Sequence, residues 1–188
     1  MDKKKWLLLS AVLIVAAAVT LALTLWPGDE DERPAQSLCF GSLSEATAAL
    51  IDDGKGGTVS TDEQEKKGQG DLAVLKMCFV MRDNASSDTK RGVYSLIVED
   101  TRSVPGARKD SVPLGGGIDG WVLPGTAVAQ LPTGCARRMG STAPHITVTL
   151  NAPSQEEKKG IVDRDTAIRN SAAVVRESAA NLARIAGC

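Results

Sequence analysis

Four cysteines are the residues of this sequence whose number and spacing point most directly to chemistry. Cys39, Cys78, Cys135 and Cys188 are separated by 39, 57 and 53 residues, so they do not form the close C-x-x-C pairs typical of thiol metal sites. An even number of widely spaced cysteines is typical of a protein from an oxidising compartment. The sequence therefore predicts two disulfide bonds and no thiol-bound metal.

Three pairings of four cysteines are possible. We favour Cys39 with Cys78 and Cys135 with Cys188, because each pair would fasten a helix end to a neighbouring strand. By the chain-entropy account, closing loops of this size contributes about 3 to 4 kcal/mol each. An intermolecular bond through Cys188, the final residue of the sequence, is the main alternative.

His145 is the only histidine, and a hydrolase built on serine, histidine and aspartate would need it as the base. A small extracytoplasmic hydrolase that uses His145 or a carboxylate is therefore an alternative function. Ser87 and Lys90 match the S-x-x-K pattern of a lysine-activated serine, but the partner patterns S-D-N and K-T-G are missing. That pair is more typical of a polar turn between strands.

The 52–63 loop has the spacing of a calcium site. Asp52, Gly57, Val59 and Glu63 match positions one, six, eight and twelve of a calcium-binding helix-loop-helix. Positions three and five are glycines, which supply no side-chain oxygen. The pattern favours a solvated glycine-rich loop, and a calcium-linked sensor remains a further alternative; no cofactor is expected.

Gly115, Gly117 and Gly120 spell G-x-G-x-x-G, the pattern of a dinucleotide site. Such a site needs a helix directly after the glycines, so that helical N–H groups meet the pyrophosphate. Residues 121–124 read Trp-Val-Leu-Pro and do not open a helix. These glycines therefore predict a loop.

The elements that must position these residues begin with an apolar leader. Residues 7–25 form 19 consecutive positions without a charge, enough for a helix to cross a bilayer. Trp6 and Trp26 flank the run, three lysines precede it and acidic residues follow it, which predicts a cytoplasmic N-terminus. A cleaved signal peptide is the competing interpretation, although its apolar stretch is usually shorter.

The leader divides the chain into three parts. Residues 1–26 are expected to be a cytoplasmic tip and transmembrane signal anchor, 27–38 a charged spacer, and 39–188 an extracytoplasmic disulfide-containing domain at the cell membrane. The balance of 22 basic and 23 acidic residues argues against a nucleic-acid partner. Apolar residues make up 43% of the chain but aromatics only 3%, so the core must consist mainly of small aliphatic side chains.

The domain is expected to be α+β, with a small, mainly antiparallel sheet, one short helix and a long C-terminal amphipathic helix. Ser42 and Glu45 have capping-box spacing, so the short helix should run from there to before Gly54. Residues 54–71 should form a mobile polar surface loop. Strands are expected at 72–81, 93–98, 121–123, 127–131 and 145–150.

The long helix is expected from Asp165 to Gly187. Asp163 and Asp165 are interpreted as residues that cap its start, in preference to a pair of catalytic acids. Gly187 is a suitable C-terminal stop. One helix face is apolar and advances by three and four residues: Ile168, Ala172, Val175, Ala179, Leu182 and Ile185.

Trp121 lies in a segment rich in proline and glycine. It is our candidate partner-binding residue, because a tryptophan in an irregular segment can be an exposed anchor. The alternative is that Trp121 is the largest side chain of the core.

Three features of the sequence are shared with a group of bacterial proteins that it resembles. They are the lysine-led anchor, the opening Cys39-Phe40-Gly41-Ser42-Leu43 with the segment 131–135 (LPTGC), and the ending 179–188 (AANLARIAGC). The chain resembles the uncharacterised single-pass, extracytoplasmic, cysteine-containing membrane proteins of high-GC Gram-positive bacteria. The resemblance implies a location at the cell membrane and paired cysteines, and it implies no activity or site residues.

These patterns favour a non-catalytic, membrane-anchored protein that binds a partner in the cell envelope or supports an envelope assembly. The partner could be an envelope protein or a cell-wall component. This expectation follows from the motifs above, since none of them assembles a nucleophile, a base and an orienting group.

Overall fold

A computed structural model gives the fold and describes residues 37–51, 58–67, 73–83, 89–152 and 162–188. All of these residues belong to one of the two units into which the chain divides, Gln36–Cys188, which we call the second unit. The second unit contains the whole described core and both disulfides, as a domain that folds by itself does.

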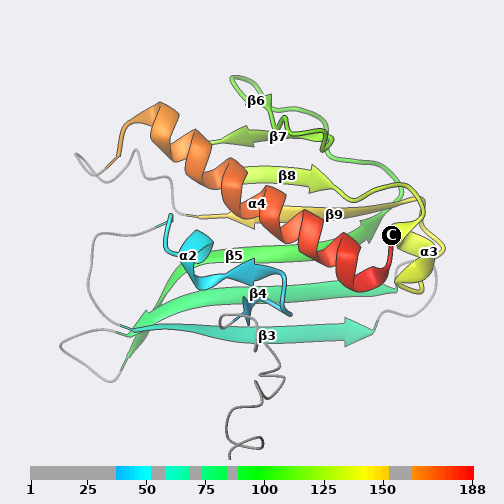
Figure 1. The fold of residues 1–188 in the computed structure, drawn as a ribbon, viewed down its shortest axis with the longest axis horizontal. Helices are drawn as coiled ribbons and strands as arrows, with labels where there is room; N and C mark the ends of the chain where they lie inside the picture. The colour runs from blue at the N-terminus through cyan, green and yellow to red at the C-terminus, as the bar shows by residue number, and fades with distance from the viewer. Residues whose placement is uncertain (1–36, 52–57, 68–72, 84–88, 153–161) are drawn as a thin grey trace, which may run out of the picture. The chain divides into compact units, whose positions relative to one another are not determined.

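The second unit is α+β, and its main sheet has seven antiparallel strands in the order β3-β4-β5-β9-β8-β7-β6 (Figure 1). A separate two-stranded sheet joins β1 and β2. The predicted strand at 145–150 is the central strand β9, which pairs with β5 and β8. The strands are β1 Ser37–Leu38, β2 Leu43–Ser44, β3 Val59–Lys67, β4 Val74–Asp83, β5 Lys90–Thr101, β6 Val112–Pro113, β7 Gly120–Leu123, β8 Thr126–Gln130 and β9 His145–Asn151.

One long helix, α4 (Arg164–Ala186), crosses one face of the sheet and lies in front of it in Figure 1. Asp163 caps its start by accepting a hydrogen bond from the Thr166 N–H at 2.9 Å. Gly187 ends it with a φ of 69°. Both ends therefore form as the sequence predicts. The buried face of α4 packs with the inward side chains of β8 and β9: Ala172, Val175, Ala179 and Leu182 with Ala127, Ala129, Ile146, Val148 and Leu150.

The expected loop at 54–71 is wrong over much of its length. Val59–Lys67 is strand β3, which pairs with β4 along its whole length at the edge of the sheet. An edge strand has one partner and often carries charges that discourage further pairing. The polar sequence of β3 therefore looks like a loop when it is considered without its partner.

The short helix is also shorter than predicted. Helix α2 spans Glu45–Ala48, and its N-cap is Ser44, whose Oγ accepts the Thr47 N–H at 3.3 Å. Ser42 instead donates its hydroxyl to the Cys39 carbonyl at 2.7 Å. The helix starts later because Leu43–Ser44 is already extended, as strand β2.

Within the described ranges, no helix is long and apolar enough to cross a membrane. The expected anchor at 1–26 lies outside the described residues, as do positions 52–57 and Ser87.

Candidate functional site

Both disulfides join the cysteines that the sequence analysis paired. Cys39 is bonded to Cys78 of β4, and Cys135 to Cys188. What they connect differs from expectation. Cys39 lies in the turn between β1 and β2, while Cys135 begins helix α3 (Cys135–Arg138) and Cys188 follows the end of α4. The second bond therefore joins two helices, not a helix and a strand.

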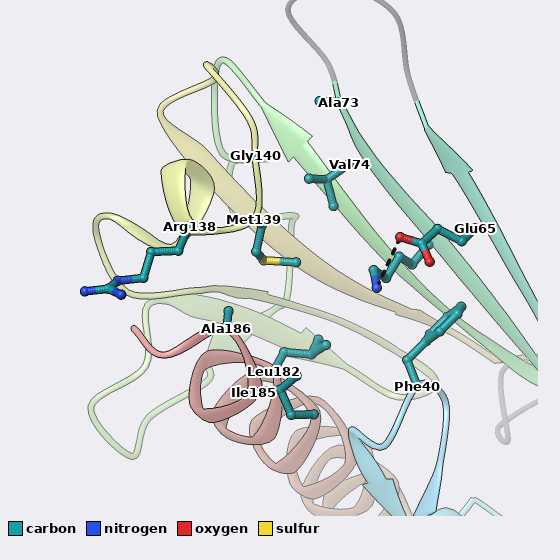
Figure 2. A pocket seen from close by; sticks show the side chains of 11 residues that line it. Phe40, Glu65, Ala73, Val74, Arg138, Met139, Gly140, Leu182, Ile185 and Ala186 are labelled. Atoms are coloured by element: carbon teal, nitrogen blue, oxygen red, sulfur yellow. Dashed lines mark ion pairs between the residues drawn. The ribbon is translucent and has the colours of Figure 1, made fainter.

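A cleft of about 460 Å³ lies between the two disulfide-bonded regions. This volume falls within the range of ligand pockets. In Figure 2 the side chains of Val74, Met139 and Leu182 point into one space, with Phe40 and Glu65 at one side of it. The described residues that line the cleft are Phe40, Glu65, Ala73, Val74, Lys76, Arg138, Met139, Gly140, Leu182, Ile185 and Ala186.

One wall of the cleft is the turn at residues 39–41, which we call the turn wall. Three successive residues have left-handed backbone: Cys39 at φ 54°, Phe40 at 60° and Gly41 at 77°. Such conformations are strained for residues other than glycine and persist only where their surroundings hold them. The disulfide holds Cys39, and Phe40 donates its N–H to Glu63 Oε1 at 2.8 Å.

The aromatic ring of the turn wall contacts an ion pair on the sheet. The Lys76 ammonium lies 5.1 Å from the centre of the Phe40 ring, a cation–π distance. The same ammonium is 3.4 Å from Glu65 Oε1, and the two side chains are 25% and 50% exposed. This end of the cleft is therefore polar and carries both charges, while its aromatic side is apolar.

Helix α4 fastens the chain that follows the turn wall. Glu177 accepts the Ser44 N–H at 2.7 Å and also a hydrogen bond from the Thr47 hydroxyl. Burial acts to raise the pKa of Glu177, but the hydrogen bonds from Thr47 and Ser44 outweigh it and hold the pKa below the ordinary value. Ser178 donates its hydroxyl to Ser42 Oγ at 3.0 Å.

The opposite wall consists of residues 135–140 and 182–188, which we call the helix wall. The disulfide between Cys135 and Cys188 links its two segments. Leu182 is buried, whereas Ile185 is 55% exposed although it belongs to the apolar face of α4. An exposed isoleucine at the mouth of a cleft leaves apolar surface free for a ligand.

Trp121 is not an exposed anchor, while a partner-binding role for it stays a prediction. It is 4% exposed, and its indole N–H donates to the Pro105 carbonyl at 3.1 Å. The Arg108 guanidinium covers the ring at 5.3 Å from its centre. Trp121 is paired with Val128 in the sheet, so it lies on the face opposite α4, under the 105–108 segment.

His145 begins β9, where its Nδ1 lies 3.1 Å from Gln130 Nε2. His145 does not line the cleft described above. Its observed partner among the described residues is an amide, which is not a nucleophile.

The described positions of the 52–63 loop do not have the geometry of a calcium-binding helix-loop-helix. Val59 and Glu63 lie in strand β3, whereas a calcium loop of this kind is followed by a helix at its twelfth position. The Glu63 carboxylate instead receives the N–H of Phe40. Across the described ranges, no group of three or more His, Cys, Asp or Glu side chains could hold a metal ion.

The predicted glycine loop is present. Gly115 and Gly117 have positive φ, and the chain turns there before Gly120 starts β7. Gly120 admits no side chain, because a Cβ would come within 2.0 Å of the Val128 carbonyl oxygen.

A second cavity of about 500 Å³ lies over β4 and β5. Phe79 and Met81 line it together with polar groups, and Asp62 is the charged side chain among its described residues. It lacks the paired charges and the disulfide-bonded walls of the first cleft, which is therefore the stronger candidate site.

Sequence reasoning missed the residues that form the first cleft. Phe40 was noted only as part of a resemblance, and Lys76 was counted within an apolar strand. A single charge inside the run LAVLKMCFVM was the available signal, since such a residue must reach solvent or a partner. The sequence marks Ile185 only as part of the apolar face of the long helix, and nothing local marks Met139, because its role comes from the meeting of two helix ends.

Comparisons with protein-family models, with curated proteins and with solved structures find no match to this chain.

Proposed function

We propose that this chain is a single-pass membrane protein whose extracytoplasmic domain binds a component of the cell envelope without catalysing its conversion. The observation that carries the proposal is the cleft between the turn wall and the helix wall, which combines apolar side chains with one ion pair. Pockets of this kind, apolar with a few placed polar groups, are the usual binding sites of proteins.

Two features support the proposed location of the domain outside the cytoplasm. The sequence supplies an apolar leader at 7–25 with a basic start, and the folded unit that follows it has two disulfides, which persist in oxidising compartments. The resemblance to single-pass extracytoplasmic proteins of high-GC Gram-positive bacteria points the same way.

The binding role is tested with a photo-reactive amino acid at position 185 of the full chain in its native cells. The matched control carries it at position 50, because Leu50 is also an exposed apolar residue, at 40% exposure, but lies outside the cleft lining. We expect irradiation to yield a cross-linked envelope component from position 185 and none from position 50. Equal labelling from both positions, or none from 185, contradicts the proposal.

The address is tested by carbonate extraction and by a reporter fused to the C-terminus. We expect the protein to stay in the membrane fraction and the reporter to be active only outside the cytoplasm. Release of the protein into the soluble fraction contradicts the anchor, and a reporter active in the cytosol contradicts the orientation.

A further inference from the structure

The chemistry of the cleft narrows the class of ligand, and this inference rests on the proposed binding function. We infer that the cleft takes an anionic single-chain amphiphile, an aliphatic chain that ends in a carboxylate or phosphate. Three properties of the cleft lead to this ligand: the backbone groups of its loops, its charges and its volume.

The described loop residues that line the cleft all have their backbone N–H groups hydrogen-bonded. The Phe40 N–H donates to Glu63, the Ala73 N–H to Asp100 Oδ2 at 2.8 Å, and the Gly140 N–H to the Arg137 carbonyl at 3.1 Å. An extended peptide gains much of its affinity from main-chain hydrogen bonds. An aliphatic chain needs none, so these loops suit an aliphatic ligand better than a peptide.

The apolar part of the lining fits such a chain. Val74, Met139 and Leu182 converge on the interior in Figure 2, and Ile185 extends the apolar surface to the mouth. Methionine adapts its shape to different ligands because its side chain is unbranched and flexible.

The charges near the mouth favour an anionic head group. Among the described residues, the lining holds two cations, Lys76 and Arg138, and one carboxylate, Glu65. A further carboxylate, Asp100, accepts the N–H of the lining residue Ala73 but is buried, at 4% exposed. Arg138 is directed away from the interior in Figure 2, but its long exposed side chain can turn toward a bound anion.

The volume sets the size of the ligand. At about 30 Å³ for each water-sized group, a cleft of about 460 Å³ holds roughly fifteen such groups. A medium-length chain with its head group has this size, and dodecanoate is therefore a suitable probe.

The test is isothermal titration of the oxidised unit Gln36–Cys188, which avoids the detergent that the full chain needs. The titrants are dodecanoate, dodecanol and dodecyltrimethylammonium, each below its micelle concentration. We expect dodecanoate to bind with one-to-one stoichiometry and the cationic amphiphile to bind about ten-fold more weakly. Equal affinity for the anionic and cationic probes overturns the inference.

Variants separate a role in binding from a role in folding. Ile185→Asp places a carboxylate at the mouth of the cleft, and we expect it to weaken dodecanoate binding about ten-fold, while the control Leu50→Asp leaves it unchanged. Lys76→Gln should weaken binding of dodecanoate but not of dodecanol, and Lys90→Gln, on an exposed lysine outside the lining, should change neither. An Ile185→Asp variant that binds dodecanoate normally overturns the inference.

The outcomes also separate this inference from the proposed function. Suppose that the photo-reactive residue at position 185 captures a protein and that the isolated unit does not bind dodecanoate. This result overturns the inference of an amphiphile ligand, but it agrees with the proposed binding function.

Discussion

The two walls of the cleft are both closed by disulfides, yet they are held in different ways. The turn wall is bonded to the sheet through Cys78 and Glu63, and the chain after it is bonded to α4 through Glu177. The helix wall, by contrast, consists of two short segments, one at helix α3 and one at the end of α4. The Cys135–Cys188 bond joins them.

Because they are held differently, the two walls should differ in rigidity. A strained turn with several independent attachments is a fixed surface, which can present Phe40 and the Lys76 ion pair in one geometry. Residues 184–188 of the helix wall are mostly exposed, and an exposed helix end can open locally at lower cost than the core. We therefore expect ligands to enter by displacement of the helix wall against a fixed turn wall.

Removal of either disulfide should have the largest effect on the free energy of unfolding and should distinguish the two walls. The enclosed segments have sequence separations of 39 and 53, so by the chain-entropy account each bond contributes about 4 kcal/mol. We expect Cys39→Ala with Cys78→Ala to lose about this much, and Cys135→Ala with Cys188→Ala to lose less. The freed end of α4 gains conformational freedom in the folded state, which offsets part of the loss.

Urea unfolding of the two double variants measures these free energies, and hydrogen exchange locates the change. Faster exchange confined to residues 182–188 and 135–140 is expected for the second variant. A larger loss for the helix-wall variant than for the turn-wall variant contradicts the comparison.

Glu177→Ala should have the next largest effect. It leaves the Ser44 N–H and the Thr47 hydroxyl without their acceptor, and loss of such partners costs about 1 to 3 kcal/mol. Urea unfolding measures the loss. Glu177→Gln, which keeps one acceptor oxygen, is the matched control and should lose less; equal losses from both would show that packing and not hydrogen bonding fastens the chain after the turn wall.

Gly41→Ala should cost about 1 kcal/mol, because the φ of 77° is unfavourable for a residue with a Cβ. The new Cβ would lie 3.6 Å from Ile185 Cδ1, an ordinary contact, so strain is the only penalty. Gly140→Ala in the helix wall has a similar φ of 85° and open space around it. We expect its cost by thermal unfolding to be smaller, since that wall can relax; the reverse order would contradict this assignment.

The smallest effect concerns pH. The folded-state pKa of Glu177 lies below its ordinary value of 4.5, so the stability from its carboxylate is present above that pH and is lost as the pH falls through the folded pKa. Unfolding of the wild type and Glu177→Gln is compared between about pH 6 and pH 3. The stability difference between them should shrink on acidification, and a constant difference would exclude a role for the charge.

Much of the framework could be predicted from the sequence, because its signals are local. The alternation in HITVTL marks β9, the run LAVLKMCFVM marks β4, and Asp163 and Gly187 set the ends of α4. A period of two residues, a period of 3.6 and a capping side chain each act within a few residues. The even number of widely spaced cysteines likewise predicts two disulfides.

The site was decided by the tertiary structure alone. Phe40, Lys76 and Met139 are distant in sequence, and they share a cleft because a disulfide bends the turn onto β4 while another brings α3 to the end of α4. Tertiary contacts likewise cover Trp121 with the 105–108 segment. The physical reason is that burial and charge pairing depend on which segments meet, and that is a property of long-range packing that no single stretch of residues contains.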